Sequence, residues 1–113
     1  KANSPSPKVL PREVAEHFGD LYILYNNRIC PLQTFARDFT IKLYGSSSYK
    51  GLTPEEVLTG WLFYYDSWKN EPIIRIKSNE ARKLLEIEGN YARLKDYIST
   101  INEYPFVIIH ILR

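Results

Sequence analysis

One segment, residues 51–77 (GLTPEEVLTGWLFYYDSWKNEPIIRIK), constrains the fold more than any other part of the chain. Thr53 and Glu56 have the spacing of a capping box, and Pro54 suits the first helical position. The sequence therefore predicts a helix that starts at Thr53 and runs to Asp66. Apolar residues recur along it at helical spacing. We expect the following side chains to form its buried face: Val57, Leu58, Trp61, Leu62 and Tyr65.

Shorter signals predict further elements before this segment. We expect a short helix at Arg12–Phe18 and a β-hairpin at Leu21–Leu32, whose strands meet at Asn26-Asn27. Asparagine tolerates positive φ, so this pair suits a two-residue turn. A helix then follows the hairpin, because apolar residues recur at helical spacing as far as Gly45, which ends it.

The end of the segment predicts a strand at Pro72–Lys77, with Ile74 and Ile76 facing inward. A helix capped by Ser78 or Asn79 should follow this strand through Ile87, and Gly89 should stop it. The 51–77 segment is thus a compact αβ unit, and its residues alone indicate no catalysis.

The order of signals along the chain is α-ββ-α-α-β-α-α-β, which predicts an α+β fold. Short helices should pack on a small sheet made of the hairpin and additional strands. The order includes a helical pattern at 94–101 and, at 106–112, a final strand or a short buried helix. A chain of 113 residues has room for one core. We therefore expect a flexible, polar lead-in at 1–10 and a single domain at 11–113.

Composition narrows the classes of function. A formal net charge of +2, with no dense Lys/Arg run, disfavours binding to nucleic acid. The single cysteine, Cys30, excludes an internal disulfide and a multi-cysteine metal site. No stretch has the form of a signal peptide or the apolar length of a membrane span.

Three residues have side chains that could ligate haem iron: His17, Cys30 and His110. Cys30 precedes a proline, as the thiolate does in some haem-responsive proteins, and His110 lies in an apolar run. A lone His in a strand is more often a hydrogen-bonded core or edge residue, and a free Cys is more often a small buried apolar side chain. These three are therefore weak candidates for a haem contact.

The sequence predicts no catalytic centre and no metal site. It contains no serine or cysteine nucleophile spaced with a base and an orienting group, no Gly-rich phosphate loop, and no His/Asp metal spacing. We therefore expect that the domain is not an enzyme and holds no cofactor of its own.

Several motifs resemble a known family when they are taken in order. They are FGDL at 18–21, RICPLQTFA at 28–36, GLTPEEVLTG at 51–60, Trp68, EPIIRI at 71–76, EARKLL at 80–85, and Tyr91. Together they resemble the extracytoplasmic segment of cytochrome c biogenesis proteins of the fused System II type (CcsA/ResB-ResC-like), found in Bacteroidetes-like bacteria. The chain departs from that family at Asn27, where glycine is expected, and at Cys30, where a polar residue is usual.

The resemblance implies a function that composition does not. Members of this family are multi-span membrane proteins that deliver haem across the membrane and attach it to Cys-x-x-Cys-His motifs of apocytochromes. The resemblance implies a periplasmic domain, at the outer face of the inner membrane, that holds apocytochrome c or another maturation subunit. A haem- or small-ligand-binding domain of the same machinery is the alternative. We expect the partner contacts to be exposed aromatic residues, since amphipathic rings often anchor interfaces: Tyr44, Tyr49, Tyr64 and Trp68.

Overall fold

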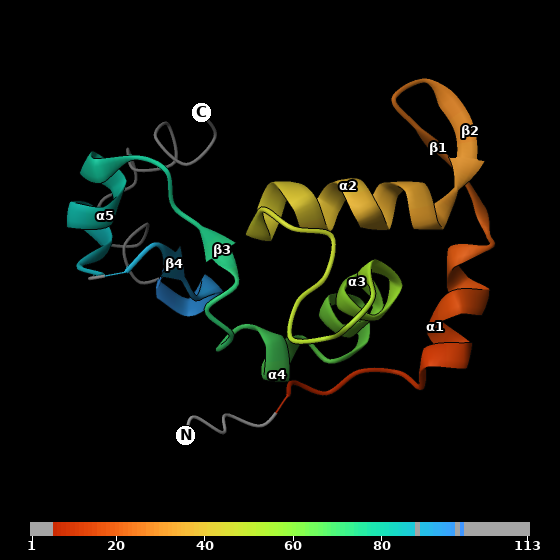
Figure 1. The fold of residues 1–113 in the computed structure, drawn as a ribbon, viewed down its shortest axis with the longest axis horizontal. Helices are drawn as coiled ribbons and strands as arrows, with labels where there is room; N and C mark the ends of the chain where they lie inside the picture. The colour runs from red at the N-terminus through yellow and green to blue at the C-terminus, as the bar shows by residue number, and fades with distance from the viewer. Residues whose placement is uncertain (1–5, 88, 97, 99–113) are drawn as a thin grey trace. The chain divides into compact units, whose positions relative to one another are not determined.

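The computed structural model describes residues 6–87, 89–96 and 98. It confirms an α+β fold with small antiparallel two-stranded sheets (Figure 1). The chain divides into two compact units, Lys1–Trp68 and Lys69–Arg113. The sequence predicts one domain across 11–113, and the joining of these two units into one domain stays a prediction.

Three helices and a hairpin make up most of the first unit. In chain order its elements are α1 (Arg12–Gly19), β1 (Tyr22–Tyr25), β2 (Arg28–Pro31), α2 (Leu32–Tyr44), α3 (Pro54–Phe63) and the short α4 (Tyr65–Trp68). Helices α1, α2 and α3 pack on one another, and α2 also contacts both strands of the hairpin. In Figure 1 the hairpin extends from the N-terminal end of α2.

The hairpin turn is confirmed at the predicted pair. Asn26 and Asn27 have φ values of 55° and 62°, the left-handed conformation that a type I′ turn needs at both central positions. The antiparallel register pairs Tyr25 with Arg28 and Leu24 with Ile29. Strand β2 leads directly into α2, which ends as predicted at Gly45, where φ is 97°.

The capping box at the start of α3 is also confirmed. The Thr53 hydroxyl accepts a hydrogen bond from the backbone N–H of Glu56 at 3.2 Å, and the Glu56 carboxylate accepts one from the Thr53 N–H at 2.9 Å. Two of the backbone donors at this helix start are therefore satisfied by side chains.

The predicted end of this helix and part of its buried face are wrong. Helix α3 stops at Phe63, because Tyr64 leaves the helical region with φ −128° and ψ 47°. The break takes Tyr65 out of register with α3, and Tyr65 is 43% exposed. Leu62 is 63% exposed and Trp61 is only partly buried, whereas Val57 and Leu58 are buried as predicted. The middle of α3 is instead enclosed by α1 and α2, which buries five consecutive residues, 56–60.

Trp68, at the end of α4, takes the central place that the sequence assigned to Trp61. Its side chain is 0% exposed, and its indole N–H donates to the carbonyl of Lys8 at 2.7 Å. Its ring lies on Gly60, where an added Cβ would come within 2.2 Å of the indole nitrogen. The lack of a side chain at Gly60 therefore makes room for the indole ring. Residues 7 and 8, from the expected lead-in, belong to this packing, because Pro7 is buried and the Lys8 N–H donates to Ser67 Oγ at 3.0 Å.

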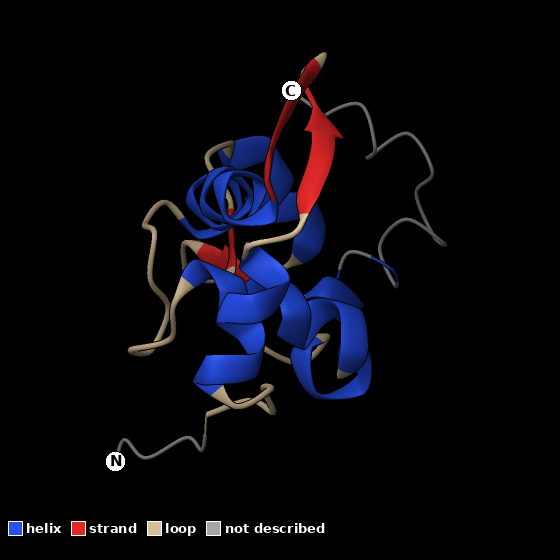
Figure 2. Ribbon diagram, turned by 90° about the vertical axis from the view of Figure 1, so that its right-hand side faces the viewer, coloured by secondary structure: helices blue, strands red, loops and turns tan. Residues whose placement is uncertain are grey.

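The second unit has a smaller apolar core. Its described elements are β3 (Ile74–Arg75), α5 (Asn79–Leu85) and β4 (Tyr91–Ala92), with β3 and β4 paired antiparallel (Figure 1). The longer strands that stand out in red in Figure 2 are those of the hairpin in the first unit. The buried core side chains are Ile76, Ala81, Leu85 and Ala92, with Ile74 and Ile87 packed against them. Ile76 is therefore buried and Ile74 is partly buried, in agreement with the prediction, but Ile73 is fully buried as well, and the strand is shorter than expected.

Helix α5 is capped as predicted and ends earlier. The Ser78 hydroxyl accepts from the Ala81 N–H at 3.2 Å. The helix stops at Glu86, where φ is 56°, rather than at Gly89. Residues 94–96 and 98 are helical, in agreement with the helical pattern at 94–101. The strand expected at 106–112 lies outside the described residues, and so does His110.

Candidate functional site

The haem candidates differ in where they lie. Cys30 is 8% exposed on β2, opposite Ile23 in the register. His17 lies on the surface, in the last turn of α1. Among the described residues, no group of three His, Cys, Asp or Glu side chains could hold a metal ion. The structure therefore gives neither His17 nor Cys30 a set of co-ligands.

Two of the four aromatic residues expected as exposed partner contacts are buried, and the expectation is wrong for them. Tyr49 is 2% exposed and Trp68 is 0% exposed. They belong to a chain of ring contacts in the core: the Tyr49 centroid lies 4.9 Å from that of Tyr44 and 5.8 Å from that of Trp68. The Trp61 ring continues this chain at 5.8 Å from Trp68. Tyr44 and Tyr64 are partly buried, so these rings serve packing first.

The exposed apolar surface lies instead on the outer side of the hairpin. Tyr22, Leu24 and Ile29 are 72%, 74% and 73% exposed. Leu24 and Ile29 are register partners, and Tyr22 is two residues from Leu24, so the three side chains share one face of the two-stranded sheet. We call these three residues the hairpin face. Large apolar side chains that are this exposed and adjacent mark interaction surfaces more often than isolated ones do.

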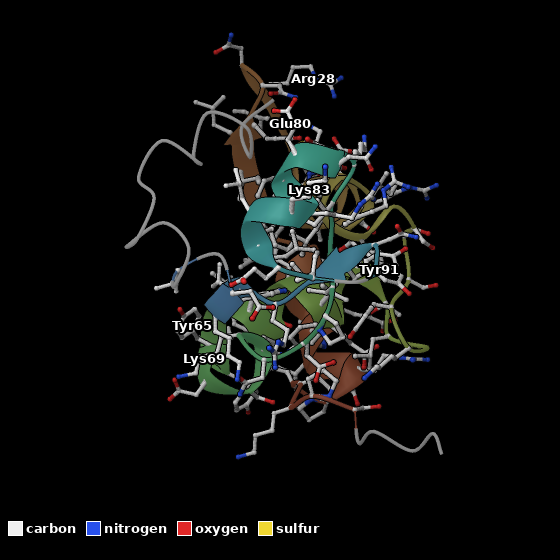
Figure 3. The ribbon with its side chains drawn as sticks, turned by 90° about the vertical axis from the view of Figure 1, so that its left-hand side faces the viewer. Arg28, Tyr65, Lys69, Glu80, Lys83 and Tyr91 are labelled. Atoms are coloured by element: carbon white, nitrogen blue, oxygen red, sulfur yellow. The ribbon has the colours of Figure 1, made fainter. Side chains whose placement is uncertain are left out.

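The opposite side of the hairpin explains why this face is left open. The Tyr25 ring packs edge-on against Phe35 of α2, with centroids 5.0 Å apart, and its hydroxyl donates to the Asp38 carboxylate at 3.1 Å. Cys30 is buried on the same side as Tyr25. Since one side of the hairpin rests on α2, alternation turns Tyr22, Leu24 and Ile29 outward. Figure 3 labels Arg28, the charged residue of β2, on this hairpin.

Sequence reasoning found the hairpin and missed its outer face. The signal was present in residues 21–25, LYILY, which are apolar or aromatic on both alternating sides. A strand with one side on the core and one side in water normally alternates apolar with polar residues. The lack of that alternation was the sequence evidence for an apolar outer face.

A second exposed apolar group lies at the end of α3. Leu62 and Phe63 are 63% and 53% exposed. Phe63 also contacts Phe18 of α1, with ring centroids 5.3 Å apart. This group is therefore partly used in holding α1 to α3.

The one buried carboxylate of α3 has a structural role. Glu56 is 4% exposed, and its Oε1 accepts from Thr53 N–H and lies 3.3 Å from Arg12 Nε. The Arg12 guanidinium also donates to the Gly51 carbonyl at 3.1 Å. These bonds tie α1 to the start of α3, so the carboxylate is engaged by the fold.

Comparison with known proteins gives one informative relation. The chain matches no protein-family model. It is 32% identical over 95 residues to the protein NrfI of Wolinella succinogenes, a match that covers 82% of this chain and 10% of NrfI. The chain thus spans about a tenth of the length of this relative and is its distant, partial homologue. Within the described residues, no helix has both the length and the apolar character needed to cross a bilayer.

Proposed function

We propose that this chain is a non-catalytic interaction domain of a membrane-bound cytochrome c biogenesis protein. The setting is supported by the relation to NrfI, a CcsA-like cytochrome c biogenesis protein. The ordered motifs that resemble the fused System II family support the same setting. The domain lies at the periplasmic face of the membrane and holds apocytochrome c, or another maturation subunit, near the site of haem attachment.

The hairpin face is the observation that carries this role. Tyr22, Leu24 and Ile29 place adjacent apolar side chains in water, where they contribute little to folding and mark an interaction surface. A partner that covers them removes apolar surface from water and gains binding energy. Tethering of such a partner beside a reaction site raises its effective concentration, so the domain aids haem attachment while its own side chains do no chemistry and hold no cofactor.

A genetic test separates this role from a purely structural one. In cells that depend on the gene encoding this chain, Leu24→Asp combined with Ile29→Asp puts two charges on the hairpin face. We expect covalently bound haem in c-type cytochromes, measured by haem staining, to fall several-fold. The abundance of the altered protein, measured by immunoblot, should stay the same.

Ile41→Asp is the matched control, because Ile41 is an exposed apolar residue on α2 rather than on the hairpin. Haem attachment should be normal in this variant. Normal haem attachment in the double hairpin variant would refute the proposed function.

A further inference from the structure

The hairpin has a free edge as well as an exposed face, and the two lie together on β1. A two-residue turn places a hydrogen-bonded pair next to it, here Tyr25 and Arg28 in the register, and such pairs then alternate along the ladder. The bond from the Leu32 N–H to the Leu21 carbonyl, at 2.6 Å, fits this alternation. The N–H and C=O groups of Tyr22 and Leu24 therefore point away from β2.

These four backbone groups have no hydrogen-bond partner among the described residues. Natural edge strands discourage further pairing with charges, prolines, bulges or a covering element. Strand β2 has two of these devices, Arg28 at its start and Pro31 at its end. Strand β1, with the sequence YILY, has no charge and no proline, and only its short length limits pairing. The two edges of the hairpin therefore differ, and β1 is the one open to pairing.

We propose that the free edge of β1 binds an extended polypeptide segment as a third strand of the hairpin. Apolar side chains at alternate positions of this segment would lie beside Tyr22 and Leu24 on the hairpin face. The inference deepens the proposed function and rests on it for its setting, because it names the class of partner: an unfolded, extended chain.

The unpaired backbone groups decide between a polypeptide and a lipid surface. A strand supplies alternating N–H donors and C=O acceptors at the spacing of the β1 edge, as in other cases of strand addition. The hydrocarbon of a bilayer supplies neither and would leave the four groups unpaired, which strongly disfavours their burial there. The edge therefore favours a peptide over a membrane.

The test uses the purified chain and a fluorescent peptide of about six alternating valines and threonines, a common strand length. Fluorescence anisotropy should show saturable binding. The same peptide with every backbone amide N-methylated keeps its side chains but loses its donors, and it should not bind. Binding of the methylated peptide would overturn the inference, because contact would then depend on side chains alone.

A pair of variants tests the same edge from the side of the protein. Leu24→Pro removes an N–H that points away from β2, so it costs the hairpin no ladder bond. Leu24→Thr shortens the side chain and keeps that N–H. Loss of edge hydrogen bonds should weaken peptide binding about tenfold or more in Leu24→Pro, against less than about threefold in Leu24→Thr. The NMR amide signals of Ile23 and Cys30 report whether the hairpin persists.

Equal peptide affinity in the wild type and in Leu24→Pro, with the hairpin intact, would overturn the inference. Self-association that is lost in Leu24→Pro, without peptide binding, would also overturn it and would assign the edge to a second copy. The proposed function can fail on its own. If the wild-type chain binds the peptide but haem attachment stays normal in the Leu24→Asp, Ile29→Asp variant, the proposed function is refuted and the inference about the β1 edge stands.

Discussion

At the scale of single residues, Gly60 and Trp68 fit closely together in the first unit. Trp68 is fully buried and is fixed by its hydrogen bond to Lys8, so the indole has little freedom to move away. A Cβ at position 60 would approach the ring at 2.2 to 2.9 Å. Gly60→Ala should destabilise the chain by about 1–3 kcal/mol, as overpacking does, in spite of alanine's better helix propensity. Urea denaturation measures this change.

Leu62→Ala is the control on the same helix. The side chain is 63% exposed, so its truncation should cost less than about 0.5 kcal/mol. A Gly60→Ala variant as stable as the wild type would mean that Trp68 does not occupy the place described.

Asp96 makes a pH-dependent contribution to the stability of the second unit. Burial raises the pKa of its carboxyl group. Hydrogen bonds from the Arg93 side chain and N–H, together with the charges of Arg93 and Lys95, lower the pKa by more than burial raises it. The pKa of Asp96 therefore lies below its ordinary value. The same pair raises the pKa of the Arg93 guanidinium. Because the folded form binds its proton less readily, this stabilisation is present above the pKa of the unfolded chain, about 3.9 for an aspartate, and is lost as the pH falls through the folded pKa.

Asp96→Asn should therefore reduce the loss of stability between neutral and acid pH. Urea denaturation at about pH 7 and about pH 3, on either side of the ordinary aspartate pKa, measures that loss. The effect should be below about 1 kcal/mol, because the pair is partly in water. Arg93→Gln should reduce this loss of stability by a similar amount. If both variants lose as much stability in acid as the wild type, the Arg93–Asp96 pair does not contribute to the acid dependence.

At the scale of elements, local capping and turn signals were the most predictable features. The box at Thr53, the cap at Ser78 and the stop at Gly45 depend on neighbours within a few residues. The sequence alone therefore located the box and the stop, and it limited the cap to Ser78 or Asn79. The end of α3 and the burial of Trp61 depend instead on how α4 folds back and on which helices enclose α3. Those are tertiary contacts, and helical periodicity carries no information about them.

Thr53→Ala tests the best-predicted cap. It removes the hydroxyl that accepts from the Glu56 N–H, and it should cost about 1 kcal/mol of unfolding free energy. Thr53→Ser keeps the acceptor and should stay close to the wild type in urea denaturation. Equal losses in the two variants would show that the hydroxyl does not cap α3.

Asn27 tests the hairpin turn, with its φ of 62°. Alanine pays a steric cost in the left-handed region that asparagine tolerates, so Asn27→Ala should destabilise the chain by about 1–2 kcal/mol. Asn27→Gly should be neutral or stabilising, because Asn-Gly is a preferred type I′ pair. The reverse order of the two variants in urea denaturation would argue against the turn.

At the scale of the whole molecule, the fold class was predictable and the candidate interaction site was not. The aromatic residues chosen from the sequence were expected to be exposed, and two of them, Tyr49 and Trp68, fill the core instead. The sequence did not predict the hairpin face, because large apolar residues in a strand are expected to lie in the core. Only the packing of Tyr25 and Cys30 on α2 shows which side of the strand faces water.

The three candidate haem ligands give the boldest prediction for the molecule, since the function proposed above sets it in a haem-handling system. Capture of haem requires an axial ligand in an open apolar pocket. Cys30 is buried on the side of the hairpin that faces α2, and His17 lies on the surface at the end of a helix. Hemin titration followed by the Soret band should therefore show weak, non-saturating binding that is the same in the wild type and in His17→Ala, Cys30→Ser and His110→Ala. Saturable one-to-one binding that is lost in one of these variants would establish a haem site and favour a ligand-binding role for the domain.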